Sequence, residues 1–158
     1  MSTEEKRATG AAEFDAFVAG HGRRLVQVLT SGFGPDIGRE AADEALVLVW
    51  QRWERVAEMD HPFAYTVTVG RNHAKRLLKR RRPVLPAPAA THEVRIEPGL
   101  EGAIARLPER RRQALMLVHG FGWTMSEVAE ALGISKSSVQ THCERGLASI
   151  RRTLGVES

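Results

Sequence analysis

The 158-residue chain contains one cysteine and one tyrosine, and aromatic side chains make up only 6% of its residues. A single cysteine excludes an internal disulfide framework, so the fold must depend on apolar packing. No apolar run approaches the roughly 20 residues of a membrane span, and the opening stretch MSTEEKRATGAAEFD lacks the apolar core of a signal peptide. These absences predict a soluble, cytoplasmic protein that does not insert into a membrane.

Patterns typical of enzymes and metalloproteins are missing as well. The histidines show no zinc-site spacing, and the chain has no H-E-x-x-H, no phosphate-loop glycine pattern and no C-x-x-C. We therefore expect no catalytic residues, no metal site and no cofactor, and we interpret the chain as a non-enzyme. The histidines are His21, His61, His73, His92, His119 and His142.

What the chain does contain is positive charge and enough apolar residues for a core. Lys and Arg number 23 against 19 Asp and Glu, which gives a formal net charge of +4. This balance favours an anionic partner without naming one. Hydrophobic residues make up 42% of the chain, and its length fits one medium domain or two small ones.

Apolar spacing indicates helices at the start of the chain. Residues 1–11 are polar and expected to be frayed, whereas apolar residues recur at helical intervals from Glu13 to Leu29. The stretch SGFGPDIG then breaks this helix. Asp36 is the expected N-cap of a second helix near residues 37–57.

A third helix is expected to begin at Pro62 and to end in the basic segment GRNHAKRLLKRRR. A basic strip of that length fits a phosphate backbone. Phe63 and Tyr65 stand just before it, and aromatic side chains beside a basic strip can hold single-stranded bases. We interpret Tyr65 as a core residue, and a basic end that only aids solubility is the alternative for the strip. The basic residues are Arg71, Lys75, Arg76, Lys79, Arg80, Arg81 and Arg82.

Prolines change the composition abruptly after this helix. The stretch PVLPAPAATHEV contains Pro83, Pro86 and Pro88, which favour extended polyproline geometry. We interpret it as a flexible linker between domains, and a long ordered loop within one domain is the alternative. The predicted organisation is a helical domain over residues 12–82, a linker over 83–97 and a second domain over 98–155.

The second half carries the pattern of a helix-turn-helix, in which two short helices are joined by a tight turn. Thr124 and Glu127 form a T-x-x-E capping box that opens the first helix, and Gly133 ends it. Ser135 is expected to cap the second helix, which runs over residues 136–153.

Short helices are also expected in PGLEGAIARL and over residues 108–119, and no segment shows a strand pattern. The predicted fold class is therefore all-α. It consists of two small helical domains joined by a Pro-rich linker, and the C-terminal domain is a helix-turn-helix.

The same spacing separates core from surface in the helix-turn-helix. Cys143 falls on the apolar stripe and is interpreted as structural, because redox-sensing cysteines are exposed. On the opposite face, Gln140 fits adenine, Glu144 can accept from cytosine and Arg145 fits guanine. A plain helical hairpin with a solvated face is the alternative. The expected core residues are Val128, Ala129 and Leu132 on the first helix and Val139, Cys143, Leu147 and Ile150 on the second.

These features together resemble a known family. The stretch LPERRRQALMLVHGFGWTMSEVAEALGISKSSVQTHCERGLASIRR has a Leu-Pro start, spaced arginines, a glycine turn, Glu-Val-Ala, Leu-Gly-Ile-Ser and a closing Ile-Arg. The chain resembles a short bacterial RNA polymerase sigma factor of the extracytoplasmic-function (ECF) group of the sigma-70 family. AADEALVLVWQRW resembles the helix that docks on the polymerase clamp, and HPFAYTVTVGRNHAKRLLKRRR the segment that melts and reads the −10 element. The resemblance covers residues 12–82 and 98–154.

The resemblance implies a function in transcription initiation. Such a protein binds core RNA polymerase, through the clamp of the largest subunit and the flap of the second-largest, and directs it to promoter DNA. An anti-sigma factor is a further partner that the family admits. The implied polymerase-binding residues are Glu40, Asp43, Glu44, Val47, Trp50 and Gln51. The implied −10 residues are Met59, Asp60, His61, Asn72, Lys75, Arg76, Lys79 and Arg80. The implied −35 residues are Lys136, Ser137, Ser138, Gln140, Thr141, Glu144 and Arg145.

Two other functions compete with this interpretation. The stretch SVQTH also resembles the output domain of LuxR-type regulators, which would bind duplex DNA as a dimer and need no core polymerase. A lone output domain does not require the basic strip and the proline linker. A protein that only sequesters a helical partner would leave the polar face from Lys136 to Arg145 without a role.

Overall fold

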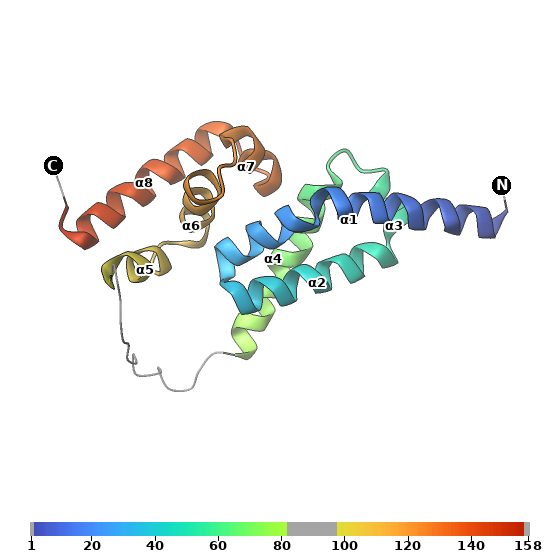
Figure 1. The fold of residues 1–158 in the computed structure, drawn as a ribbon, viewed down its shortest axis with the longest axis horizontal. Helices are drawn as coiled ribbons and strands as arrows, with labels where there is room; N and C mark the ends of the chain where they lie inside the picture. Colours follow the sequence, from blue (N-terminus) through green and yellow to red (C-terminus); the bar gives the residue numbers. More distant parts are fainter. Residues whose placement is uncertain (1, 82–97, 157–158) are drawn as a thin grey trace.

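The structure, a computed structural model of the chain, describes residues 2–81 and 98–156. Every regular element in these ranges is helical, which confirms the all-α prediction. The helices form an elongated body in which the start of α1 and the end of α8 lie at opposite ends (Figure 1). The predicted linker over residues 83–97 lies outside the described residues, so the domain boundaries stay a prediction.

The first helix, α1 (Thr3–Phe33), begins much earlier than its sequence suggested. The Ser2 hydroxyl accepts a hydrogen bond from the Glu5 amide at 3.2 Å, and the Glu5 carboxylate accepts one from the Ser2 amide. This capping box satisfies amides that would otherwise be unpaired at a helix start. The prediction that residues 1–11 fray is therefore wrong for residues 2–11, the part that the structure describes.

The turn into α2 (Pro35–Gln51) is built from glycine and proline rather than from a polar cap. Gly34 has φ +88°, which favours glycine, and Pro35 occupies the first turn, where a missing amide costs nothing. Asp36 lies inside the first turn of α2, so its predicted role as the N-cap is wrong. The expected single helix to residue 57 is also interrupted at Arg52 and continues as α3 (Trp53–Ala57).

The break after α3 and the helix that follows it agree with the sequence. Residues 58–61 form the connection, and α4 (Pro62–Arg80) begins at Pro62 as predicted. A buried face of small and apolar residues, with Val67, Gly70, Ala74 and Leu77, packs α4 against the other helices and leaves its basic side chains outward.

The second half begins with α5 (Pro98–Ala105) and α6 (Glu109–Leu115). The last turn of the helix expected over residues 108–119 is a π-helix, η1 (Met116–Gly120). A turn with Gly122 and Trp123 leads into the helix-turn-helix, which consists of α7 (Met125–Leu132) and α8 (Lys136–Leu154).

All three predicted caps of the helix-turn-helix are present. Thr124 and Glu127 form the capping box of α7, with distances of 2.8 and 3.0 Å. Gly133 ends α7 in the left-handed conformation with φ +68°. The Ser135 hydroxyl accepts from the Ser138 amide at 3.0 Å and so starts α8. Local sequence therefore fixes the turn between the two helices.

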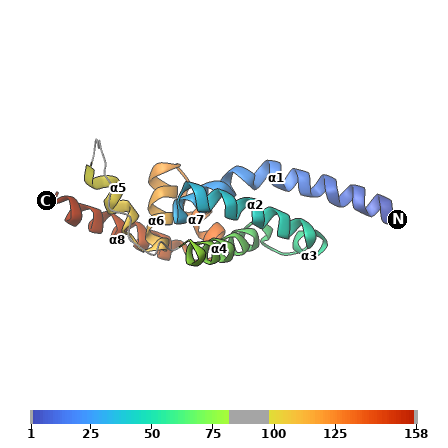
Figure 2. The same ribbon diagram turned by 90° about the horizontal axis from the view of Figure 1, so that it is seen from below.

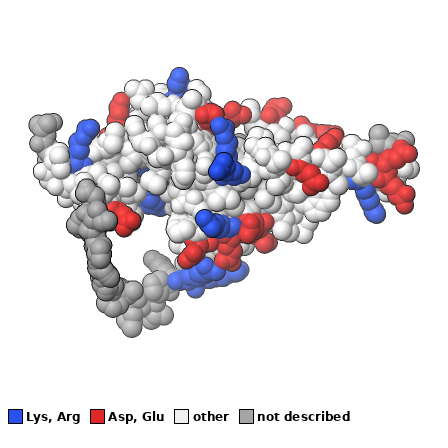
Figure 3. All heavy atoms as spheres, in the orientation of Figure 1, with Lys and Arg blue, Asp and Glu red and all other residues white. Residues whose placement is uncertain are grey.

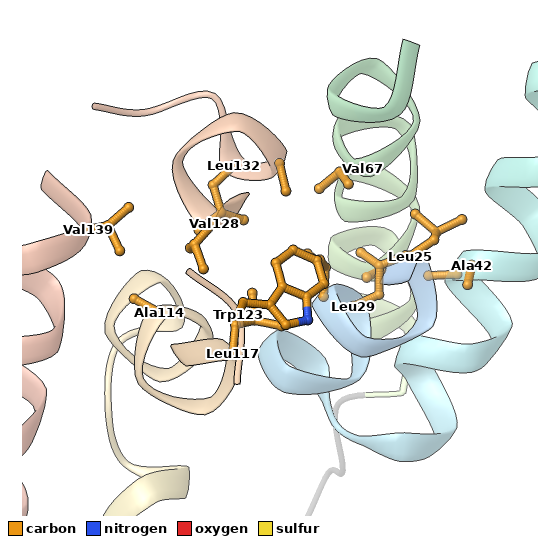
Figure 4. Packing of buried hydrophobic residues seen from close by; sticks show 14 of the residues in the cluster. Leu25, Leu29, Ala42, Val67, Ala114, Leu117, Trp123, Val128, Leu132 and Val139 are labelled. Atoms are coloured by element: carbon orange, nitrogen blue, oxygen red, sulfur yellow. The ribbon is translucent and has the colours of Figure 1, made fainter. Parts of the chain in front are cut away.

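One apolar core runs through both halves of the described chain. Trp123 lies between Leu117 and Val128 of the second half and Leu25 and Leu29 of α1 (Figure 4). Its indole Nε1 donates to the Gln27 side chain at 2.8 Å. Seen from below, α6 and α7 remain side by side with α1 and α4 (Figure 2). The two halves are therefore packed together in this structure.

Part of the expected core of the helix-turn-helix has other partners. Val128 and Leu132 do share a cluster with Val139 and Cys143, as predicted. Leu147 and Ile150 instead pack with Ala103, Ile104, Leu107 and Leu115 of α5, α6 and the turn between them. The prediction placed them on α7, which is too short to reach the second half of α8.

Polar contacts join the halves around the core. Gln113 of α6 is fully buried and donates to the Val28 carbonyl at 3.3 Å. Arg112 donates to the Gly32 carbonyl at the end of α1. Arg24 lies 2.5 Å from the Glu127 carboxylate and 4.8 Å from the Trp123 ring centroid. These contacts satisfy polar groups that packing the halves would otherwise leave unpaired.

Candidate nucleic-acid interface

The N-terminal part of α8 presents a polar face to solvent. Lys136, Ser137, Gln140, Glu144 and Arg145 are exposed, and the opposite face is buried. Gln140 donates to the Glu144 carboxylate at 3.1 Å, one helical turn away. Of the remaining predicted −35 residues, Ser138 and Thr141 are half-buried. The fold therefore brings the predicted −35 residues onto one surface that a DNA groove can reach.

The start of this face carries a group of hydroxyls. Ser135 Oγ lies 3.1 Å from Ser137 Oγ and donates to Ser138 Oγ at 2.9 Å. Lys136, in the same turn, adds a positive charge beside the helix N-terminus. Hydroxyls and a cation at such a position suit phosphate or base-edge contacts.

The predicted −10 residues fall in two groups. Met59, Asp60 and His61 form an exposed connection between α3 and α4. His61 Nδ1 lies 3.8 Å from the Glu130 carboxylate of α7, so this connection faces the helix-turn-helix half. The second group is exposed along α4 and consists of Asn72, Lys75, Arg76, Lys79 and Arg80.

Two arginines of the predicted basic strip are engaged within the protein. Arg71 pairs with Glu109 of α6 at 2.6 Å, and Arg81 pairs with Glu40 of α2 at 2.5 Å. Lys and Arg side chains gather at the described end of α4, with acidic side chains immediately beside them (Figure 3). The strip free for a phosphate backbone is therefore shorter than the sequence suggests.

The two aromatic residues before the strip are both partly buried. Tyr65 packs with Val49, Trp53 and Val56, in agreement with its interpretation as a core residue. Phe63 packs against the main core and stacks on His21, with ring centroids 5.0 Å apart. Neither ring is fully open to a base.

The predicted polymerase-binding residues share one side of α2. Five of them are exposed and Glu44 is half-buried. Val47 and Trp50 keep 50% and 46% of their surfaces exposed, which is unusual for apolar side chains of this size. They border a groove of about 620 Å³ whose other apolar walls include Phe14, Val18 and Leu46. This surface has the character of a protein-docking face.

Three further observations concern cysteine reactivity, metal binding and membrane crossing. Cys143 is 3% exposed, and burial, followed by the nearby Glu144 carboxylate, raises the pKa of its thiol. Within residues 2–81 and 98–156, no cluster of His, Cys, Asp and Glu is arranged to hold a metal ion. Among the helices in those ranges, none combines the length and apolarity that crossing a membrane requires.

Sequence reasoning missed the arginines at the start of α6. Arg110 and Arg111 lie near His142 and Arg145 of α8, and these cations, after burial, lower the pKa of His142. The spacing of arginines in LPERRR was visible, but only the crossing of α6 and α8 shows which helix face they approach.

Comparison with known proteins shows which family the second half of the chain resembles. Residues 99–150, from the start of α5 to the end of the α8 core stripe, match the family described as sigma-70, region 4. The match is confined to the second half of the chain, and the matched residues are called region 4 below. The match includes α7, the turn and α8 as far as Ile150, with the caps and the exposed face of α8.

Two curated relatives of the chain are named as sigma factors of the ECF group. The chain is 31% identical over 72 residues to the ECF RNA polymerase sigma factor SigM of Mycobacterium tuberculosis, in strains H37Rv and ATCC 35801. The match covers 46% of this chain but only 37% of those relatives. It therefore spans little more than a third of their length.

Two solved structures share the fold of almost the whole chain. One is the sigma factor RpoE in complex with the anti-sigma factor NepR from Bartonella quintana, with a TM-score of 0.60 and 16% identity. It covers 92% of this chain and 99% of RpoE. The other is CnrH in complex with the cytosolic domain of CnrY, with a TM-score of 0.59, 22% identity and 96% coverage of both chains. The likeness of fold extends beyond region 4 to the first half of the chain. The LuxR-type alternative is not favoured, because the helix-turn-helix matches sigma-70 region 4.

Proposed function

We propose that this protein is an ECF-type sigma factor, which acts in the cytoplasm, binds core RNA polymerase and directs it to promoters. The observation that carries the proposal is the joint presence of a region 4 helix-turn-helix and a first half folded as in RpoE. Sigma factors are initiation factors and not known enzymes, which fits a chain whose candidate residues bind rather than catalyse.

The first half would supply the polymerase contact and the −10 contact. Val47 and Trp50 would dock on the clamp of the largest subunit, since they are large, apolar and exposed. Glu40, Asp43, Glu44 and Gln51 would surround them with polar contacts. Met59, Asp60 and His61 would receive an extruded base of the −10 element, a role that suits an exposed connection.

The basic side of α4 would hold the melted strand or the adjacent duplex. Phosphate contacts of this kind add affinity and salt dependence but little sequence information. The residues assigned to it are Asn72, Lys75, Arg76, Lys79 and Arg80.

Region 4 would read the −35 element and contact the polymerase flap. Gln140, Glu144 and Arg145 would face base edges, while Lys136, Ser137, Ser138 and Thr141 would meet phosphates or bases. Because the linker over residues 83–97 would join this contact to the −10 contact, the second contact becomes intramolecular. Neither DNA contact then needs high affinity on its own. An anti-sigma factor is a fitting regulatory partner, since RpoE was solved with NepR.

The decisive experiment mixes the full chain with bacterial core polymerase and measures co-elution and run-off transcription. We expect a stable complex that initiates at a subset of promoter sequences. A chain that stays free of core polymerase yet binds duplex DNA as a dimer would contradict the proposal.

The two DNA contacts can be tested separately in the same reconstituted system. Gln140→Ala with Arg145→Ala should reduce transcription from promoters that depend on the −35 sequence. Lys75→Ala, Arg76→Ala and Lys79→Ala together should weaken promoter opening and lower its salt dependence. Unchanged transcription in the first case, or an unchanged salt slope in the second, would remove the corresponding assignment.

A further inference from the structure

A pocket of about 860 Å³ lies between the first turns of α1 and the segment where α2 passes into α3. The start of α1 runs beside α3 (Figure 1). Thr3, Arg7 and Gly10 line the pocket at helical spacing, so one face of α1 forms a wall. Residues 50–55 form the rest of the lining. A pocket of this volume is large enough for a small organic molecule.

Two tryptophans give this pocket a fixed apolar surface. Trp53 is 8% exposed and packs against Phe14 and Phe17 of α1, with ring centroids 5.3 and 5.2 Å away. Trp50 is 46% exposed and packs on Phe14, with ring centroids 5.0 Å apart. Because neighbouring rings hold both indoles in place, the pocket offers a preformed surface to an apolar group.

Trp53 also brings an unpaired hydrogen-bond donor to the pocket. Its indole Nε1 is buried and has no hydrogen-bond partner among the described residues. A Cβ built on Gly10 would lie 3.8 Å from Cδ1 of Trp53, the carbon bonded to Nε1. The edge of the indole that carries the donor therefore faces the part of α1 that lines the pocket. A buried donor without an acceptor costs free energy, and an oxygen that enters beside Gly10 would supply the acceptor.

Positive charge surrounds this donor on both sides of the pocket. Lys6 and Arg7 line it from α1, and Arg52 and Arg55 line it from the opposite wall. All four are exposed, and none lies within 4.0 Å of a carboxylate oxygen of the described residues. Glu54 is the only acid among the described lining residues. The pocket thus combines apolar surface, net positive charge and a buried N–H donor.

We propose that this pocket binds a small organic carboxylate, a molecule with an apolar body and one ionised carboxyl group. The body lies on Trp50 and Trp53, and the carboxylate accepts from Trp53 Nε1 and pairs with a guanidinium of the rim. The buried donor favours such a ligand over a nucleic-acid strand, because the phosphates of a strand stay at the surface and leave Nε1 unpaired.

The pocket adjoins the face assigned above to the polymerase clamp. Trp50 lines both this pocket and the groove that Val47 borders. A bound carboxylate should therefore weaken docking on the clamp, and this consequence rests on the proposed function. Binding of the carboxylate to the free chain does not depend on that function.

The first test is an NMR titration of the isotope-labelled full chain with dodecanoate, at neutral pH and below its micelle concentration. We expect the indole N–H signal of Trp53 to move downfield as the donor gains an acceptor. The Trp123 signal is an internal control and should stay in place, because that N–H already donates to Gln27. Dodecanol, which lacks the charge, should bind about tenfold more weakly or less tightly still. Equal binding of dodecanol, or a Trp53 signal that does not move, would overturn the proposal.

A glycine variant tests whether the carboxylate reaches Nε1. Gly10→Ala places a methyl group beside the indole at an ordinary contact distance, so the fold should tolerate it while the route to Nε1 narrows. We expect the affinity for dodecanoate to fall by about tenfold. Gly20→Ala, in the same helix with nothing within 4 Å of the new Cβ, is the matched control and should bind as the wild type does. Equal affinities of the two variants would contradict the assigned position of the carboxylate.

A pair of arginine variants tests the charge. Arg7→Gln with Arg55→Gln removes one cation from each wall, and we expect the affinity for dodecanoate to fall by about two- to tenfold. Arg151→Gln, which neutralises an exposed arginine in the last turn of α8, is the control and should leave the affinity unchanged. Thermal unfolding of each variant checks that the fold is intact. A double variant that binds like the wild type would show that the pocket does not select an anion.

Two further outcomes separate this site from other occupants and from the proposed function. If single-stranded DNA moves the Trp53 N–H signal and dodecanoate does not, the pocket binds nucleic acid and the proposal is wrong. If the chain fails to bind core polymerase with or without dodecanoate, the proposed function fails, while the titration of the free chain still decides whether the carboxylate site exists.

Discussion

Arg71 of α4 donates from Nε to one carboxylate oxygen of Glu109 on α6 at 2.6 Å and from Nη2 to the other at 3.3 Å. The two side chains retain 28% and 18% of their surface. This forked pair joins α4, the helix that carries the basic strip, to region 4. Arg71 was expected to contact nucleic acid, but in the structure it joins the two halves of the chain.

Loss of the Glu109 carboxylate should destabilise the packed halves. Glu109→Gln leaves the half-buried Arg71 without a counter-charge, and we expect the free energy of unfolding to fall by about 1–3 kcal/mol. Urea denaturation measures the change. Glu40→Gln, which removes the partner of the more exposed Arg81, is the control and should cost less than about 1 kcal/mol. Equal costs for the two variants would contradict a special role for the Arg71–Glu109 pair.

Gly32 at the end of α1 is predicted to tolerate no side chain. A Cβ there would lie 2.6 Å from Nε2 of Gln113, whose amide is buried and bonded to the Val28 carbonyl. We expect Gly32→Ala to lower stability by about 1–3 kcal/mol, because Gln113 cannot move without losing that bond. Gly20→Ala, in the same helix with nothing within 4 Å of the new Cβ, should instead stabilise by about 0.5–1 kcal/mol. Thermal unfolding compares the two, and a neutral Gly32→Ala would show that the halves do not stay packed in solution.

Glu127 should make stability depend on pH in the acid range. The Thr124 amide, followed by the Arg24 guanidinium, lowers the pKa of its carboxyl from 4.5 to about 2. Because the folded pKa is the lower one, the unfolded chain binds the proton first. The stabilisation is complete above pH 4.5 and disappears as pH falls toward 2. Unfolding midpoints between pH 6 and 2.5 should therefore fall less steeply in Glu127→Gln than in the wild type. If the unfolding midpoints of the two proteins fall in parallel with pH, Glu127 is not the source of this pH dependence.

Cys143 should be inert in the folded protein. Its thiol is buried and its pKa raised, so the reactive thiolate is scarce. Reaction with a thiol reagent should proceed only as fast as α8 separates from α7, and denaturant should accelerate it strongly. As the only cysteine of the chain, it reports this opening without a background signal. Rapid modification under native conditions would mean that region 4 opens readily.

Features governed by neighbours in the chain were predictable. Thr124 and Glu127, Gly133 and Ser135 define the helix-turn-helix because caps and left-handed glycines act within a few residues. Pro62 fixes the start of α4 for the same reason. The Ser2–Glu5 capping box was equally visible, and attention to it would have placed the start of α1 correctly.

The sequence by itself determined the all-α class, the helix-turn-helix and the polar face of α8, since each depends on local hydrogen bonds or on the 3.6-residue period of one helix. Only the tertiary structure decided which faces meet. In the folded chain Trp123 lies between the two halves, and Arg71 pairs with Glu109. Leu147 and Ile150 pack against α5 and α6. Arg110 and Arg111 of α6 act electrostatically on His142 of α8. These contacts join residues that are distant in the sequence. Local sequence patterns do not predict them, because their energy comes from packing, charge and desolvation between different helices.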